Sequence, residues 1–387
     1  MNSQKIWQPP RLRQDDESGV ERHVTWLELF FDLVFVAAIS ELSHYLSNHL
    51  SVDGFLSVAI FFVPIWWCWV GATFYATRFD TDDLSDRLLT LLQMAIVMVM
   101  AVNIHHGLEK ASSIFALCYI SFRGILVLQY LYAQYHVPAT RKLALWYAAG
   151  FSLSILFWGV SLLFPFPFSL IFWGFGLIID FCTPLKAGRW VAQAPPSLSH
   201  IPERVGLFTI IVLGESVIGV VKGLSGLEWS LFSALTAFSG LCIAFSLWWL
   251  YFHCANSTPL QSMHQGKMSL GLAWLYAHLF LGMGLIGTGV GVEHMVMHPS
   301  PAISATPAVW LFCLSVSLCL ITLSGIHRLS YPLGNRQFHQ SLSLHHLGAA
   351  TFSSVLIFAA SSLSSLGLVM LMALVFIVQV GIAIAKR

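Results

Sequence analysis

The sequence predicts an all-α polytopic membrane protein with about twelve transmembrane helices. Of its 387 residues, 57% are hydrophobic and 10% are charged, whereas a soluble globular protein carries about 25% charged residues. The mean hydropathy is +0.76. Apolar runs of about 20 residues, the length that crosses a hydrocarbon core, recur along the whole chain. The lipid bilayer is therefore the expected partner of most of the surface.

Six apolar runs divide the first half of the chain. The N-terminal tail is polar and includes Asp15, Asp16 and Glu17, so the first span is expected to act as its own insertion signal. The fifth and sixth spans are separated only by the short loop PFPF, and one continuous helix is an alternative there. In chain order, the predicted spans are 24–46, 54–76, 87–108, 112–135, 143–163 and 167–184.

Six more apolar runs follow a polar linker. The last two are separated only by SSLSS, so they too could form one helix. These predicted spans are 204–222, 229–251, 268–292, 307–328, 343–361 and 364–385.

The basic residues predict that both termini are cytoplasmic. With the N-terminus inside, sixteen of the nineteen Lys and Arg residues fall in inner segments, Lys110 and Lys222 fall in outer loops, and Arg123 lies within a span. Cytoplasmic loops of membrane proteins carry an excess of Lys and Arg. One span more or fewer would break this alternation, so the charge pattern supports the count of twelve.

The second half of the chain repeats features of the first. The second and eighth spans each carry a Trp pair, and the first and seventh both begin with Glu-Arg. Six spans in each half would give two parallel repeats related by an axis along the membrane normal. The predicted organisation is a cytoplasmic tail (1–22), a first six-helix half (23–190), a cytoplasmic linker (191–203) and a second six-helix half (204–387).

The first span carries two carboxylates on one face. Glu28 and Asp32 are spaced i, i+4, whereas Glu41 points to roughly the opposite face near the outer surface. A charged side chain at a helix centre costs about 2.5–3.5 kcal/mol on insertion scales, so it is expected to have a partner or a function. Arg123 is the expected basic partner. A structural ion pair and a transport-linked proton or cation relay both remain open for Asp32.

Two polar residues lie within spans of the second half. Glu215 is close to mid-membrane, and Gly214, Ser216 and Gly219 around it allow close backbone approach. His278 can change charge near neutral pH, although a membrane histidine often only links helices by a hydrogen bond. The transport or proton-relay candidates are therefore Glu28, Asp32, Arg123, Glu215 and His278.

The loop after the second span, RFDTDDLSDR, is rich in acids. Asp82 or Asp83 is expected to cap the third span, because a carboxylate accepts the free N–H groups at a helix N-terminus. A divalent-cation site is an alternative, but the full calcium-loop pattern is absent, and a structural latch is the preferred interpretation. The motif residues are Arg78, Asp80, Asp82, Asp83 and Arg87.

No catalytic, metal or cofactor motif stands out. The run GMGLIG matches GxGxxG, but it lies inside an apolar span and follows no strand, so packing explains it better. The seven cysteines contain no CxxC pair. The net charge is +1 and no basic tract is present, which gives no support to a nucleic-acid partner. We expect neither an enzyme nor a cofactor.

Three motifs in their order resemble one family. RHVTWLELFFDLVFVAAI, then RFDTDD, then GLFTIIVLGESVIGVV are similar to the bacterial low temperature requirement A (LtrA) proteins. The resemblance covers nearly the whole chain from about residue 21. It implies a multi-pass protein of the bacterial inner membrane that is linked to growth in the cold, and it supplies no biochemical activity.

These features favour a proton- or cation-coupled secondary transporter of an unknown small solute or ion. A cation channel lined by the first and seventh spans is one alternative. Arg22 with Phe30-Phe31-Asp32 is similar in layout to an arginine and Phe-Ser-Asp motif of some twelve-helix potassium channels, although the serine is absent here. A non-transport membrane factor that supports growth at low temperature is the other alternative.

Overall fold

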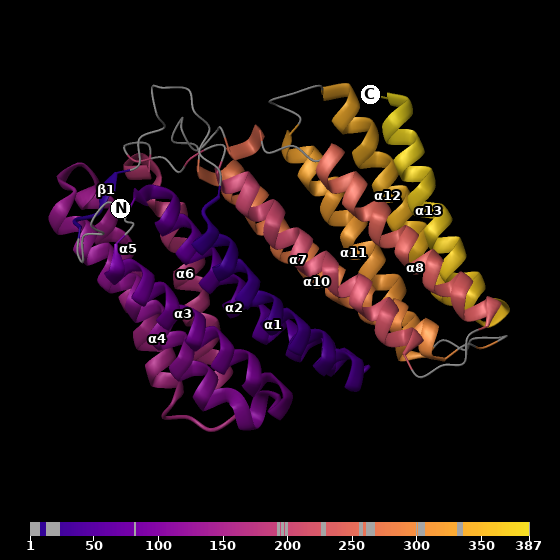
Figure 1. The fold of residues 1–387 in the computed structure, drawn as a ribbon, viewed down its shortest axis with the longest axis horizontal. Coiled ribbons are helices and arrows are strands. Elements are labelled where there is room, and N and C mark those ends of the chain that lie inside the picture. Colours follow the sequence, from indigo (N-terminus) through magenta and orange to yellow (C-terminus); the bar gives the residue numbers. More distant parts are fainter. Residues whose placement is uncertain are drawn as a thin grey trace, which may run out of the picture. The chain divides into compact units, whose positions relative to one another are not determined.

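Long helices make up almost all of the described chain (Figure 1). The computed structural model describes residues 8–12, 24–80, 83–191, 194, 197, 200–225, 230–254, 258–260, 268–298, 300, 306–330 and 336–386. Ten segments of this described part are long and apolar enough to cross a membrane. The chain is therefore a polytopic, all-helical protein.

The first part of the chain contains six long helices and a short pair of strands. β1 (Arg11–Leu12) pairs antiparallel with β2 (Phe79–Asp80). The 3-10 turns η1 (Ile104–His106) and η2 (Pro138–Thr140) connect neighbouring helices. The long helices are α1 (Trp26–Asn48), α2 (Val52–Arg78), α3 (Leu84–Asn103), α4 (Gly107–His136), α5 (Arg141–Ser161) and α6 (Ser169–Val191).

The second part is also built from long helices. A π-helical turn, η3 (Leu250–Cys254), extends α8, and the 3-10 turns η4 (Thr258–Leu260) and η6 (Ala360–Ser362) follow other helices. The long helices are α7 (His200–Leu224), α8 (Leu231–Trp249), α10 (Met268–Met297), α11 (Pro307–Ser330), α12 (Arg336–Ala359) and α13 (Ser365–Lys386).

The helix boundaries decide two of the sequence alternatives. α5 and α6 are separate helices on either side of PFPF, and α12 and α13 are separate helices on either side of SSLSS. Of the ten segments that are long and apolar enough to cross a membrane, Leu84–His136 contains both α3 and α4, and α1 is not among the ten. The count of twelve spans, the parallel repeat, the half boundaries and the cytoplasmic termini remain predictions.

The chain divides into two compact units, which are described separately. The first unit comprises residues 1–41, 60–205 and 260–272. Within it α3 packs on α4, α4 on α5 and α5 on α6. Its core is aromatic: the buried ring of Trp158 stacks on Tyr119 and on Trp173, with centroids 4.1 and 4.6 Å apart.

The second unit comprises residues 42–59, 206–259 and 273–387. Within it α11 packs on α12, and α13 packs on both α8 and α12. Two glycines of the GxGxxG-like run, Gly284 and Gly287, lie in α10 and face α11. A Cβ on Gly284 would come within 2.7 Å of Cys319 Sγ, and one on Gly287 within 2.1 Å of Ser315 Oγ. The structure thus confirms that this run serves helix packing.

Candidate functional site

A buried ion pair joins α1 to α7 in the first unit. Arg204 Nη2 lies 2.6 Å from Asp32 Oδ1, and both residues are only 1% exposed. Trp69 of α2 donates its indole N–H to the same carboxylate oxygen over 2.7 Å. Thr73, one turn further along α2, accepts a hydrogen bond from Arg204 Nη2 over 3.4 Å. Three helices therefore position the Asp32 carboxylate.

Glu28 adds a second carboxylate to the same guanidinium. Its Oε1 lies 3.5 Å from Arg204 Nη1, and its Oε2 lies 3.4 Å from Nε2 of His200. We call Glu28, Asp32, His200 and Arg204 the carboxylate cluster. It contains two carboxylates, one guanidinium and one imidazole that is charged only when protonated.

Glu28 also stabilises the start of its helix. The backbone N–H and the hydroxyl of Thr25 donate to Glu28 Oε2 over 2.8 and 2.9 Å, and Glu28 N–H donates back to Thr25 Oγ1 over 3.3 Å. This reciprocal pattern is a capping box. Glu28 therefore lies in the first turn of α1, and Asp32 is the deeper of the two carboxylates.

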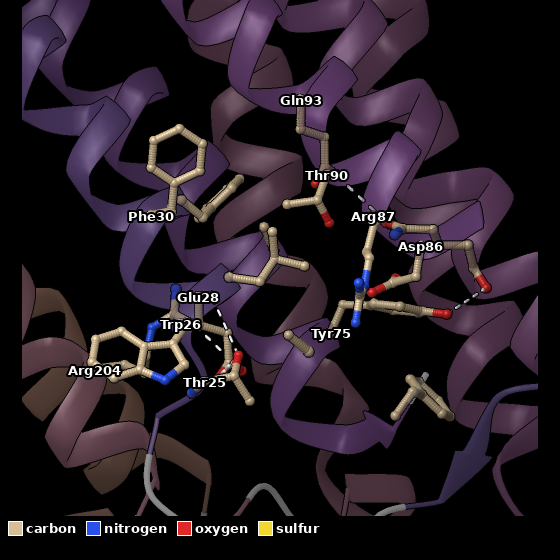
Figure 2. Close-up of a pocket in the computed structure, with 16 residues that line it drawn as sticks. Thr25, Trp26, Glu28, Phe30, Tyr75, Asp86, Arg87, Thr90, Gln93 and Arg204 are labelled. Carbon is tan, nitrogen blue, oxygen red and sulfur yellow. Dashed lines mark hydrogen bonds and ion pairs between the residues drawn. The ribbon is translucent and has the colours of Figure 1, made fainter. Parts of the chain in front are cut away.

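A cavity of about 540 Å³ opens beside the carboxylate cluster. Figure 2 shows Glu28 and Arg204 on one side of it, across from Asp86, Arg87 and Gln93. Aromatic rings cover much of the remaining wall. The lining aromatic residues are Trp26, Phe30, Phe31, Tyr75 and Phe79.

The sequence led us to expect that Arg123 pairs with the acids of α1, but the structure shows a different partner. Arg123 Nη2 lies 3.2 Å from Asp180 Oδ2 on α6, and both side chains are fully buried. Tyr119 and Ser154 donate their hydroxyls to the same Asp180 oxygen over 2.5 and 2.8 Å, while the ring of Phe151 lies 4.5 Å from the guanidinium carbon. This is a closed, neutral pair.

The sequence missed Asp180 because the predicted sixth span ended at residue 184. α6 continues to a kink at Gly188 and ends at Val191, so Asp180 lies well inside the helix rather than near its end. The importance of Arg204 was not recognised either, because it stands at the start of the seventh predicted span, where an arginine fits the positive-inside rule without a partner. His200 was not considered because it falls in the predicted cytoplasmic linker. A capping-box motif, Thr25-x-x-Glu28, was the one local signal for the position of Glu28.

The acidic loop contributes mainly to the N-cap of α3 and to the contact with the β1 segment. Asp83 is the N-cap of α3 and accepts a hydrogen bond from Asp86 N over 2.8 Å, which confirms the predicted cap. Asp83 Oδ2 also accepts the N–H of Gln8 over 2.6 Å, next to the strand pair that includes Asp80. Asp82 lies outside the described residues.

The two arginines of this loop have different surroundings. Arg87 lines the cavity. Arg78 is 1% exposed and lies among rings, with its guanidinium carbon 5.5 Å from the Phe74 centroid and 5.2 Å from the Tyr147 centroid. Cation–π contacts of this kind stabilise a guanidinium in an apolar environment.

Glu215 and His278 belong to the second unit. Glu215 is 3% exposed on α7, close to a tight crossing where a Cβ on Gly219 would come within 2.7 Å of Gly289 O. His278 hydrogen-bonds Tyr251 Oη over 2.9 Å and its own-helix carbonyl of Trp274 over 2.8 Å. Both nitrogens of His278 are thus engaged between α10 and η3, as expected of a residue that links helices.

The described part of the chain was also compared with the side-chain patterns that hold metal ions. No group of three or more His, Cys, Asp or Glu side chains is arranged there to hold a metal ion. The seven cysteines are all free.

Comparison with known proteins agrees with the motif pattern. The profile of the family described as bacterial low temperature requirement A protein matches residues 23–381. An uncharacterized protein of Rhizobium meliloti (strain 1021) is 28% identical over 315 residues, which cover 73% of this chain and 75% of the relative. No solved structure matches the chain. The chain belongs to the bacterial low temperature requirement A (LtrA) family of membrane proteins.

Proposed function

We propose that this protein is a secondary transporter of the bacterial inner membrane, coupled to protons or to a monovalent cation. The observation that carries the proposal is the charge of the carboxylate cluster. Asp32 and Glu28 share one guanidinium, so the cluster has a net charge of −1 when His200 is neutral. An uncompensated charge in a buried site costs several kcal/mol. One proton or one monovalent cation neutralises it.

The adjoining cavity offers such an ion, and a small solute, a route to the cluster. Its volume of about 540 Å³ is typical of small-molecule sites, which span roughly 300–1,000 Å³. Most lining residues come from the first turns of α1 and α3 and the last turns of α2, and Phe79 of β2, Gln129 of α4 and Arg204 of α7 complete the wall. The predicted orientation places these helix ends at the cytoplasmic side. We therefore assign the cavity as the cytoplasmic binding chamber.

The Arg123–Asp180 pair provides an internal comparison. It has one carboxylate for one guanidinium, both are fully buried, and neither residue lines the cavity. Such a pair is neutral without any bound ion, which suits a purely structural role. The carboxylate cluster differs from this pair in two properties that coupling requires: it has an excess negative charge, and its Glu28 and Arg204 line a cavity.

Purified protein in liposomes that contain a pH-sensitive dye tests this function. An inward gradient of Na⁺ or of K⁺ is applied, and the proton movement that it drives is followed as a dye signal. We expect one of the two cations to drive protons outward. Asp32→Asn should abolish the signal, and Glu41→Gln, which removes an acid of the same helix outside the cluster, should leave it intact.

Three results would contradict the proposal. A signal that survives Asp32→Asn would show that the cluster is structural. Unitary currents in planar bilayers would identify a channel instead. Liposomes in which neither cation gradient nor a pH gradient moves any ion above the protein-free background would favour a non-transport membrane factor.

A further inference from the structure

Three buried histidines meet between α11 and α12 of the second unit. His327 lies in the last turn of α11, while His339 and His346 lie on α12, seven residues and thus about 10 Å apart along the helix. His327 and His346 are fully buried and His339 is 4% exposed. His327 Nδ1 and His339 Nδ1 are 2.9 Å apart, and the rings of His327 and His346 have centroids 5.4 Å apart. We call these three residues the histidine cluster.

Hydrogen bonding defines the proton positions on His346. Its Nδ1 lies 2.9 Å from Gln379 Oε1 of α13, and a carbonyl oxygen can only accept. Nδ1 of His346 therefore carries a proton, and Nε2 of the neutral ring carries a lone pair. Between His327 and His339, one Nδ1 donates and the other accepts.

Two buried nitrogens of the cluster remain unused. Within the described part of the chain, neither His327 Nε2 nor His346 Nε2 has a hydrogen-bond partner. Histidines that only hold helices together would be expected to satisfy both nitrogens, as His278 does, because an unsatisfied buried polar atom costs about 1–3 kcal/mol. The rings of His327 and His346 are neighbours. A side-chain rotation can therefore bring their Nε2 atoms together, or a single water molecule can link them.

The three helices that carry the histidine cluster and Gln379, α11, α12 and α13, contain bases and hydroxyls but no Asp or Glu. No Asp or Glu follows Glu293 in the sequence. α10, which packs on α11, carries Tyr276, His278, Glu293 and His294. Besides the histidine cluster, the charged or titratable groups on α11, α12 and α13 are Cys313, Cys319 and Arg328 of α11, Arg336 and His345 of α12, and Lys386 of α13. No carboxylate of these three helices can therefore hold an imidazolium, which favours the transfer of a proton over its storage.

Hydroxyl pairs continue the polar line between α11 and α12. Ser324 and Ser343 have their Oγ atoms 2.7 Å apart, and Ser354 donates to Ser317 Oγ over 2.9 Å. α11 and α12 lie side by side along their lengths (Figure 1). Each hydroxyl can both donate and accept, as a chain of proton transfers requires.

We propose that His339, His327 and His346 form a proton-transfer path through the second unit. A proton that binds His339 Nε2 allows the Nδ1 proton of His339 to pass to His327 Nδ1. His327 then releases its Nε2 proton to His346 Nε2. Gln379 Oε1 accepts a hydrogen bond from the Nδ1–H of the transient imidazolium, and the imidazolium returns to the neutral ring by giving its Nε2 proton to a water molecule. Each transfer between rings breaks one N–H bond and forms another, and no electron moves. The path does not rest on the cavity or on the cation coupling of the first unit.

Proton flux into liposomes after a pH jump tests the path, with K⁺ and valinomycin present to prevent a membrane potential. His327→Gln and His346→Gln should each lower the initial flux at least about tenfold, since general acid–base groups contribute about 10²-fold or more. His345→Gln is the matched control. His345 is adjacent to His346 but bonds the backbone of Ser341 instead, so its variant should keep the wild-type flux.

A second set of measurements separates proton transfer from packing. The thermal stability of each variant in detergent shows whether it is folded, and Gln379→Leu, which removes the acceptor but no histidine, should also slow the flux. Added imidazole should restore flux to His346→Ala more than it raises flux in His345→Ala. The proposal is overturned if the wild-type protein carries no protons above protein-free liposomes, or if folded His327→Gln and His346→Gln conduct like the wild-type protein.

Discussion

At the scale of single residues, the two buried arginine sites differ in charge balance. Arg123 meets one carboxylate, Asp180, in a closed site, whereas Arg204 meets both Asp32 and Glu28 beside a cavity. Breaking a buried pair by removal of one partner typically costs 3–5 kcal/mol, because the other charge is left uncompensated. This difference leads to distinct expectations for the two sites.

Replacing Asp180 alone should destabilise the protein, and replacing both partners should restore much of the loss. Asp180→Leu leaves Arg123 without its counter-charge and should lower the free energy of unfolding by about 3–5 kcal/mol. Arg123→Leu combined with Asp180→Leu should recover most of this, since apolar residues can replace a buried pair. Unfolding in mixed detergent micelles measures both values. A double variant as unstable as the single one would argue against a structural pair.

The carboxylate cluster should respond unequally to the loss of its base and of one acid. Arg204→Met leaves the buried Asp32 without its counter-charge and takes one partner from Glu28, so it should also lower stability by about 3–5 kcal/mol. Glu28→Gln removes the excess negative charge, and glutamine can still complete the capping box with Thr25, so its stability should stay close to that of the wild-type protein. The same unfolding titration compares them. A loss in Glu28→Gln equal to that in Arg204→Met would contradict the charge count.

At the scale of helices, close packing depends on particular glycines. A Cβ at Gly291 of α10 would come within 2.6 Å of Phe312 Cβ and within 2.8 Å of its Cα on α11, whereas a Cβ at Gly325 of α11 would meet nothing within 4 Å. Backbone and Cβ atoms cannot move aside as a flexible side chain can. The contact between α10 and α11 therefore requires glycine at position 291, whereas position 325 of α11 has room for a side chain.

Gly291→Ala should accordingly lower the free energy of unfolding by about 1–3 kcal/mol, the usual range for overpacking. Gly325→Ala is the matched control and should be neutral or stabilising by up to about 1 kcal/mol, because alanine favours helix more than glycine does. Melting temperatures of the two variants in the same detergent give the comparison. Equal melting temperatures would mean that α10 and α11 are not in this close contact.

At the scale of the whole molecule, the orientation in the membrane is the main untested expectation. The excess of Lys and Arg in alternate segments predicts that both ends are cytoplasmic. A green fluorescent protein fused after Arg387 should therefore be fluorescent, and alkaline phosphatase at the same position should be inactive. Fusions at η1, the connection between α3 and α4 next to Lys110, should show the opposite pattern. An active phosphatase at the C-terminus would imply an odd number of spans.

Much of the helical architecture is predictable because the bilayer acts on each segment separately. Hydropathy located the long helices to within a few residues in most cases, and it failed mainly where polar residues prolong a helix. α12 begins at Arg336, seven residues before the predicted span, and α6 continues past Lys186. The α3 cap at Asp83 was also predictable, because capping is decided by residues three apart in the chain.

The sequence by itself determined the family, the all-helical membrane class and the two acids of α1 that merit attention. These depend on composition, hydropathy and short spacing, which are local properties. Only the tertiary structure decided which charge meets which: Arg204 rather than Arg123 beside Asp32, and Asp180 beside Arg123. The physical reason is that the partner of a buried charge depends on how each helix is rotated and which neighbour it packs against. The spacing of residues within one helix determines neither the rotation of that helix nor its neighbour.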